Sequence, residues 1–144
     1  MNNRITVIGS NAIKIEDIIA LGIGKNKAVL DSSHTYQNHL NQSVALLENL
    51  QATGTAIYGV NTGFGDSCQT EVPKDQQVLL PLNLFRYHGC GTGANFTYEE
   101  ARAMVACRLV SLAKGYSGVR PELLNALITF LNADIAPCIP QEGS

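Results

Sequence analysis

The sequence predicts a mainly α-helical fold with a short strand near its start. Three features carry this prediction: an amphipathic stretch capped by Ser33, a capping box at Thr97, and an apolar stretch that opens on Pro121. The chain has 144 residues, which suits one domain at most. Hydrophobic residues make up 45% of it and charged residues 15%, a balance that excludes a disordered chain.

The N-terminal elements are short. Residues 4–8 are rich in β-branched side chains and end at Gly9, which predicts a strand followed by a turn. A short helix is expected over residues 14–21, and Ser33 then caps a helix that runs to about Gln51. The apolar positions of this second helix recur every three or four residues: Tyr36, Leu40, Val44 and Leu47.

The middle of the chain is rich in glycine. Residues 55–60 have the composition of a strand, whereas residues 61–66 fit neither helix nor strand propensities. A helix is expected over residues 74–88, with a kink at Pro81. The simplest interpretation of the glycine-rich stretch 89–93 is the end of that helix with a tight turn.

The last third of the chain is helical. Thr97 and Glu100 form a capping box for a helix over residues 98–114, and Pro121 begins another helix. We expect this last helix to bury one apolar side: Leu123, Leu124, Leu127, Ile128 and Leu131. Residues 134–144 predict an extended tail. Helices this apolar need more partners than the chain supplies, so we infer a piece of a larger helical assembly.

Charge and hydropathy exclude several classes of function. The chain has 10 Lys and Arg residues against 12 Asp and Glu residues, and the basic residues are scattered, which excludes a nucleic-acid-binding surface. No run approaches the roughly 18 apolar residues that a membrane span needs. The start carries no secretory signal, and the cysteine usage suits a reducing compartment, so we expect a cytoplasmic protein.

Cysteine, histidine and arginine residues are expected to have structural roles. The four cysteines contain no Cys-x-x-Cys pair, and His34 and His39 do not share a helix face, so no metal site is predicted. Three cysteines lie among apolar residues and are expected in the core: Cys90, Cys107 and Cys138. Arg102 follows Glu99 by three residues, which predicts a weak surface ion pair.

Tyr58 opens the most unusual segment, a loop that contains Gly59, Gly63 and Gly65. Such a loop can present a phenol to a cavity while its bare backbone approaches a ligand, because glycine has no Cβ. Successive amides of this kind can also hold an anion. From the residues alone, a buried tyrosine in front of an irregular loop is an equally good interpretation.

The string Tyr58-Gly-Val-Asn-Thr-Gly-Phe-Gly65 strongly resembles the signature of the aromatic amino acid ammonia-lyase family, which includes histidine, phenylalanine and tyrosine ammonia-lyases and related aminomutases. Residues 83–93 resemble the substrate-selectivity helix of that family, and 101–118 resemble the helix that follows it. Residues 139–144 are similar to the stretch that leads into its Ala-Ser-Gly triplet. The resemblance implies a large helical-bundle fold, with residues 1–144 as the N-terminal portion of its prosthetic-group-bearing domain.

The resemblance also implies a prosthetic group, 4-methylideneimidazol-5-one (MIO), formed from an Ala-Ser-Gly triplet just downstream of Ser144. Ammonia elimination needs such an electrophile, because no ordinary side chain makes the β proton of an amino acid acidic enough. The resemblance further implies a homotetramer with shared active sites and a small aromatic amino acid as the bound partner.

Four residues take expected roles from the resemblance. Tyr58 matches the catalytic base, and Gly65 matches a position whose backbone lies against the amino-acid end of the substrate. His88 matches the residue that contacts the substrate ring, with a helix-end histidine bonded to backbone as the alternative. Tyr87 stands where histidine-specific members typically have serine, which argues against histidine as the substrate.

The expected activity is therefore that of an aromatic L-amino acid ammonia-lyase. L-Tyrosine, giving trans-p-coumarate, is the favoured substrate, and the chain looks more like the bacterial tyrosine-using branch. L-Histidine, giving urocanate, is second. An aromatic 2,3-aminomutase and a catalytically inactive helical relative remain as alternatives.

Overall fold

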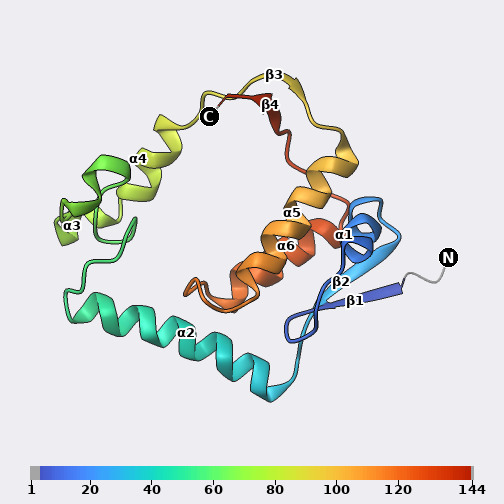
Figure 1. The fold of residues 1–144 in the computed structure, drawn as a ribbon, viewed down its shortest axis with the longest axis horizontal. Coiled ribbons are helices and arrows are strands. Elements are labelled where there is room, and N and C mark those ends of the chain that lie inside the picture. Colours follow the sequence, from blue (N-terminus) through green and yellow to red (C-terminus); the bar gives the residue numbers. More distant parts are fainter. Residues whose placement is uncertain (1–3, 144) are drawn as a thin grey trace.

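The computed structural model describes residues 4–143 and confirms the mainly helical fold. Three helices of 12 to 19 residues dominate it, namely α2, α5 and α6 in Figure 1. In chain order the elements are β1 (Arg4–Ile8), α1 (Ile15–Gly22), β2 (Asn26–Leu30), α2 (His34–Ala52), a short 3₁₀ helix η1 (Gly65–Gln69), α3 (Lys74–Gln77), α4 (Leu80–Tyr87), β3 (Thr92–Asn95), α5 (Tyr98–Leu112), α6 (Pro121–Asn132) and β4 (Pro140–Glu142).

The N-terminal strand and helix are confirmed, and a second strand that the sequence did not reveal pairs with the first. Strands β1 and β2 are parallel, with Arg4 opposite Asn26 and Ile8 opposite Leu30, and α1 forms the crossover between them. The buried Asn26 side chain donates from Nδ2 to Thr6 Oγ1 at 2.8 Å. Strand β2 opens on polar residues and pairs some 20 residues away, so local patterning does not mark it.

The core lies where β1, α1 and β2 meet α5, α6 and the first half of α2. Its buried side chains are Ile8, Leu21, Ala28, Tyr36, Leu40, Ala106, Leu109, Leu112, Ala113, Leu124, Ile128 and Leu131. The Tyr36 hydroxyl donates to the Ala113 carbonyl at 2.7 Å and so ties α2 to the end of α5. Leu123 was expected on the buried side of α6, but it is exposed because it lies outside the contact face of that helix.

The predicted helix caps are present. Ser33 Oγ accepts from the Tyr36 amide at the start of α2. Before α5, Thr97 and Glu100 bond each other reciprocally, with the Thr97 amide donating to Glu100 Oε2 at 2.8 Å. Both helices therefore begin where the sequence placed them.

Asp31 secures the link between β2 and α2. Its carboxylate accepts from the Ser33 amide at 2.8 Å and from the Ser10 amide at 3.3 Å. These bonds, the Ser33 amide foremost, lower the pKa of Asp31 from its ordinary 3.8 to about 2. Folding therefore stabilises the ionised form of the Asp31 carboxylate.

This lowered pKa predicts a pH dependence of stability. The stabilisation from Asp31 is present above the unfolded pKa near 4 and is lost as the pH falls through the folded pKa near 2. Asp31→Asn removes the titrating group, so the unfolding midpoint of the complete protein should fall less steeply between pH 4 and pH 2 than that of wild type. Parallel midpoint curves for the two proteins would show that Asp31 contributes nothing to the acid limb.

The middle of the chain differs from the prediction in two places. Residues 55–60 are not a strand: 55–57 are irregular and 58–60 form a turn, because the amides of Val60 and Asn61 bond back to the Ile57 carbonyl. The single kinked helix expected over 74–88 is two helices: α3 ends at Gln77, and Pro81 lies in the first turn of α4, where a missing amide costs nothing.

Part of the extended tail forms a strand. Strand β4 pairs antiparallel with β3, with Thr92 opposite Glu142 and Asn95 opposite Pro140. The glycine-rich stretch after α4 therefore leads into this ribbon as well as ending the helix. Figure 1 shows the ribbon above the core, beside the C-terminal end of the described chain.

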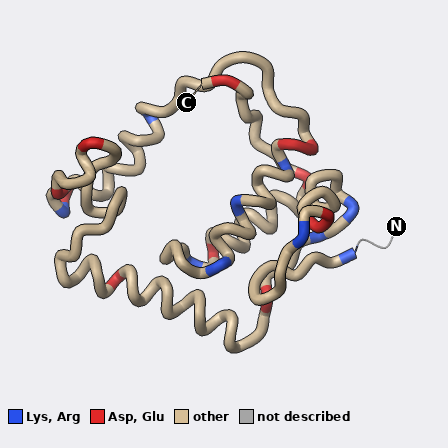
Figure 2. Tube along the Cα trace, viewed as in Figure 1, with Lys and Arg blue, Asp and Glu red and all other residues tan. Residues whose placement is uncertain are grey.

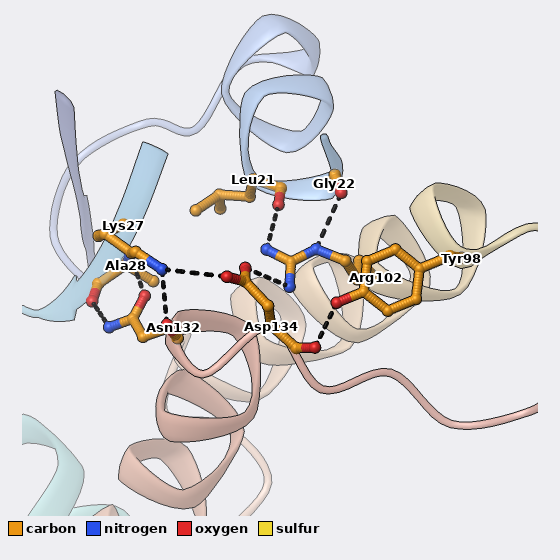
Figure 3. Close-up of polar contacts among 8 residues, drawn as sticks. All are labelled: Leu21, Gly22, Lys27, Ala28, Tyr98, Arg102, Asn132 and Asp134. Atoms are coloured by element: carbon orange, nitrogen blue, oxygen red, sulfur yellow. Dashed lines mark hydrogen bonds and ion pairs between the residues drawn. The ribbon is translucent and has the colours of Figure 1, made fainter. Parts of the chain in front are cut away.

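Arg102 is not a surface residue paired with Glu99, as the sequence suggested, but has a side chain only 1% exposed. It donates from Nε to the Gly22 carbonyl at 2.9 Å and from Nη2 to the Leu21 carbonyl at 3.0 Å (Figure 3). These carbonyls end α1 and have no partner within that helix. The error arose because the partner segment lies 80 residues away in the sequence.

The same arginine also reaches the segment after α6. Its Nη1 lies 3.0 Å from Asp134 Oδ1, as an ion pair without an aligned hydrogen bond. The Tyr98 hydroxyl donates to the Asp134 carbonyl, and the guanidinium lies over the Tyr98 ring (Figure 3). Arg102 and its neighbours thus join α1, α5 and the start of the tail.

The second half of α2, α3 and α4 lie away from the core (Figure 1). Residues 41–100, all of which the structure describes, contribute no buried hydrophobic side chain. Val78 and Phe85 are among the large apolar side chains that stay exposed there. Figure 2 shows few charged residues on this arm, and Glu48 is the sole Asp, Glu, Lys or Arg of α2. Basic and acidic residues are interspersed around the core.

The cysteines expected in the core are exposed: Cys90, Cys107 and Cys138. Cys107 lies on the outer side of α5, and the other two lie in segments that pack on little of this chain. Apolar neighbours in the sequence did not translate into burial, because burial requires a facing element.

Candidate functional site

Tyr58 lies in a tight turn that follows α2. The amides of Val60 and Asn61 both donate to the Ile57 carbonyl, at 3.1 and 3.2 Å. Gly59 has a φ of 69°, a backbone angle that residues other than glycine rarely adopt. A Cβ there would lie 2.8 Å from the Phe64 ring. The glycine therefore lets the turn close beneath the tyrosine.

The phenol of Tyr58 is held by the loop that follows it. The Gly65 amide donates to Tyr58 Oη at 3.2 Å, and the Phe64 ring packs edge-on against the Tyr58 ring with centroids 6.0 Å apart. Gly65 itself has a φ of 56°, so a glycine is favoured at the position that aims this amide. The structure thus brings two of the predicted site residues together.

The loop is closed by its own backbone. The Gly63 amide donates to the Thr70 carbonyl at 3.0 Å, and the Val72 amide donates to the Asn61 carbonyl at 2.9 Å. A Cβ on Gly63 would lie 2.7 Å from the Ser67 carbonyl oxygen, inside η1. These contacts are all internal to residues 61–72.

Asn61 and Thr62 were not singled out from the sequence, yet they are the buried polar residues of this segment. Asn61 Oδ1 accepts from the Ile57 amide at 2.6 Å, and its Nδ2 donates to the Thr55 carbonyl at 2.8 Å. Asn is a residue that commonly bonds the backbone of its own turn, which is the signal that could have found it.

The other two predicted residues end α4. His88 Nδ1 lies 3.1 Å from the Leu84 carbonyl, so this nitrogen carries the proton and donates. The backbone bond expected of a helix-end histidine is therefore present, and it leaves Nε2 as a hydrogen-bond acceptor. The Tyr87 and His88 rings meet at 5.5 Å between centroids. Both side chains are exposed, Tyr87 by 84%.

The end of the described chain packs on the loop after His88. A Cβ on Gly91 would lie 2.6 Å from Pro140 Cγ, and a Cβ on Gly143 would lie 2.8 Å from the Cys90 carbonyl oxygen. These close approaches require glycine at both positions. The described chain therefore ends beside the loop that follows His88.

The described residues do not complete an active site. No hydrogen bond or ring contact within residues 4–143 joins the Tyr58–Gly65 pair to the Tyr87–His88 pair. An open depression of about 750 Å³ lies elsewhere and is lined by none of these four residues. Tyr58 is 64% exposed. Residues 4–143 therefore leave this phenol open to solvent.

No three His, Cys, Asp or Glu residues among 4–143 gather so that they could hold a metal ion. No helix of the same residues is both long and apolar enough to cross a membrane.

Comparison with known proteins identifies the family. The sequence model of the aromatic amino acid lyases matches residues 13–144. The chain belongs to this family. Within this family, it is 36% identical over 96% of its length to a histidine ammonia-lyase of Myxococcus xanthus. It is also 39% identical over 85% of its length to an MIO-dependent tyrosine 2,3-aminomutase of Streptomyces globisporus.

Solved structures of the family share the fold. A tyrosine aminomutase from Streptomyces globisporus matches 96% of the chain with a TM-score of 0.88 and 34% identity. A histidine ammonia-lyase from Trypanosoma cruzi matches 98% of it with a TM-score of 0.79 and 31% identity. The chain spans 26% of each of these proteins, 27% of the Myxococcus lyase and 23% of the Streptomyces aminomutase sequence. The similarity therefore covers nearly all of this chain and about a quarter of its relatives.

Proposed function

We propose that the complete protein is an aromatic L-amino acid ammonia-lyase, which removes ammonia from its substrate to give a trans-arylacrylate. The observation that carries the proposal is the Gly65 amide on Tyr58 Oη at 3.2 Å. Elimination needs a base for the β proton, and an amide that donates to an oxygen fixes its lone pairs and stabilises negative charge on it. Tyr58 is thus suited to accept that proton.

We propose MIO as the prosthetic group, formed from an Ala-Ser-Gly triplet after Ser144. The packing of Gly143 against Cys90 and Gly91 supports this attachment, and these residues would hold the stretch that leads into the group. The group supplies the electrophile that makes the amino group a better leaving group. Residues 1–144 are then the N-terminal portion of the domain that bears it.

His88 supports a substrate whose ring carries a hydrogen-bond donor. With Nδ1 engaged by Leu84, its Nε2 can accept from the phenol of tyrosine or from an imidazole N–H, whereas phenylalanine offers no donor. The bulky Tyr87 favours L-tyrosine over L-histidine, as in the bacterial tyrosine-using branch. We therefore propose L-tyrosine as the preferred substrate and L-histidine as the second.

Incubation of the complete protein with L-tyrosine, L-histidine and L-phenylalanine in parallel tests this assignment. We expect the ultraviolet band of trans-p-coumarate to grow fastest, urocanate more slowly, and cinnamate slowest, because a site that hydrogen-bonds a ring donor rejects an analogue without one. Cinnamate as the fastest product would contradict the role given to His88.

A 2,3-aminomutase is the second candidate, favoured by the similarity to the Streptomyces aminomutase. A β-amino acid among the products would identify it. A catalytically inactive relative is the third, and it would be identified by the lack of Ala-Ser-Gly after Ser144.

We also propose a cytoplasmic homotetramer with shared active sites. The exposed Tyr58 and the exposed apolar side chains of Val78, Leu79 and α4 support this, because both need cover from elsewhere. Light scattering of the complete protein should give four times the mass of one chain. A monomeric mass would contradict the shared site.

A further inference from the structure

We infer that Asn61 is a positioning residue for Tyr58, a role that rests on the proposed function of Tyr58 as the base. Asn61 is 5% exposed, and its side chain makes two bonds to the backbone of the three residues that precede the tyrosine. Its Oδ1 accepts from the Ile57 amide at 2.6 Å, and its Nδ2 donates to the Thr55 carbonyl at 2.8 Å. The amide thus fixes the direction in which the chain enters the Tyr58 turn.

We call the two bonds from the Asn61 side chain to Ile57 and Thr55 the Asn61 bracket. Further hydrogen bonds hold the backbone around it. The Gly59 amide, just after the tyrosine, lies 3.4 Å from Thr62 Oγ1. The Asn61 carbonyl accepts from the Val72 amide at 2.9 Å, which anchors Asn61 to the returning arm of the loop. The backbone on both sides of Tyr58 is therefore fixed by hydrogen bonds. This fixes the position from which the phenol reaches the Gly65 amide.

No other common side chain reproduces both Asn61 bonds. An alanine makes neither, while an aspartate keeps the acceptor for Ile57 and loses the donor to Thr55. Loss of the bracket lets the turn relax and moves Tyr58 Oη relative to the substrate. A displacement of about 1 Å in a catalytic group can cost about 100-fold in rate.

Asn132 offers a matched control. Its side chain makes the same kind of bracket in the core, with Oδ1 accepting from the Ala28 amide at 2.9 Å and Nδ2 donating to the Ala28 carbonyl at 2.8 Å. Asn132→Ala therefore loses two comparable bonds without touching the Tyr58 loop. It reports what the loss of such a bracket does to the fold alone.

The experiment measures kcat, KM and the isotope effect of a β-deuterated substrate for the complete protein, with L-tyrosine and L-histidine as the probes. Asn61→Ala should lower kcat about 100-fold, change KM less than about 3-fold and raise the isotope effect, because proton abstraction becomes slower. Asn132→Ala should lower the unfolding midpoint with kcat and isotope effect close to wild type. Equal kcat for Asn61→Ala and Asn132→Ala would overturn the inference.

Asn61→Asp covers the case in which the alanine variant does not fold. It is nearly isosteric and should lower kcat about 10-fold, whereas kcat at the wild-type level would overturn the inference. In a Tyr58→Phe background, Asn61→Asp should change the residual rate little, because the two residues act through one atom. A Tyr58→Phe variant as active as wild type would instead refute the proposed base itself, so the two failures are distinguishable.

Discussion

Tyr58→Phe in the complete protein is expected to lower kcat by about 10² to 10⁴-fold, the range that a positioned general base contributes. The variant keeps the ring that packs on Phe64 and loses only the oxygen that meets the Gly65 amide. Binding of substrate should change little, so the loss should appear in kcat and not in KM.

Tyr116→Phe is the control for that experiment. Tyr116 is also an exposed tyrosine with an edge-on aromatic neighbour, His39, but it lies outside the Tyr58 loop. It should retain wild-type kcat. Steady-state rates for both variants decide the matter, and a Tyr58→Phe enzyme with wild-type kcat would remove Tyr58 from the chemistry.

Arg102→Met should destabilise the fold by about 3 kcal/mol. Methionine fills much of the space but donates to neither the Leu21 nor the Gly22 carbonyl, and each buried bond from a charged donor contributes about 1.5 to 3 kcal/mol. The ion pair adds less than about 1 kcal/mol, because the Asp134 side chain is 61% exposed and its charge is screened by water.

Two further variants separate these contributions. Asp134→Asn should destabilise by less than about 1 kcal/mol, and Glu99→Gln, which removes the acid that the sequence suggested as the partner, should have almost no effect. The shift of the urea midpoint of the complete protein reports all three. An Arg102→Met midpoint equal to that of Glu99→Gln would mean that the α1 carbonyls do not need this donor.

The helices were predictable because their signals are local. Ser33, Thr97 with Glu100, and Pro121 each lie within one turn of the helix that they begin, and each helix begins there. The glycine-rich signature from Tyr58 to Gly65 was also visible, since such a density of glycine fits no regular element. This signature marked the loop in which the structure places the contact between Tyr58 and Gly65.

The remaining features depend on residues far apart in the sequence. Strand β2 exists because β1 lies beside it, and Arg102 is buried because α1 ends against α5. No sequence pattern within ten residues of either feature predicts it. Cys107 shows the converse error, since its apolar neighbours suggested a core position, whereas its side chain is exposed within residues 4–143.

The candidate site was predicted in part. Tyr58 and Gly65 do meet; the glycine-rich loop drew attention to both, and the resemblance gave each its expected role. Asn61 was overlooked because a polar residue among glycines resembles an ordinary loop residue until its two backbone partners are known.

The most direct test of the proposed lyase activity is the stoichiometry of the reaction. The complete protein is incubated with L-tyrosine, and the ammonia and the trans-p-coumarate that it releases are measured in the same sample. The account predicts that the two products form in equal amounts and that Tyr58→Phe releases almost none of either. β-Tyrosine formed without matching ammonia would contradict it, as would the absence of both ammonia and an arylacrylate with each of L-tyrosine, L-histidine and L-phenylalanine.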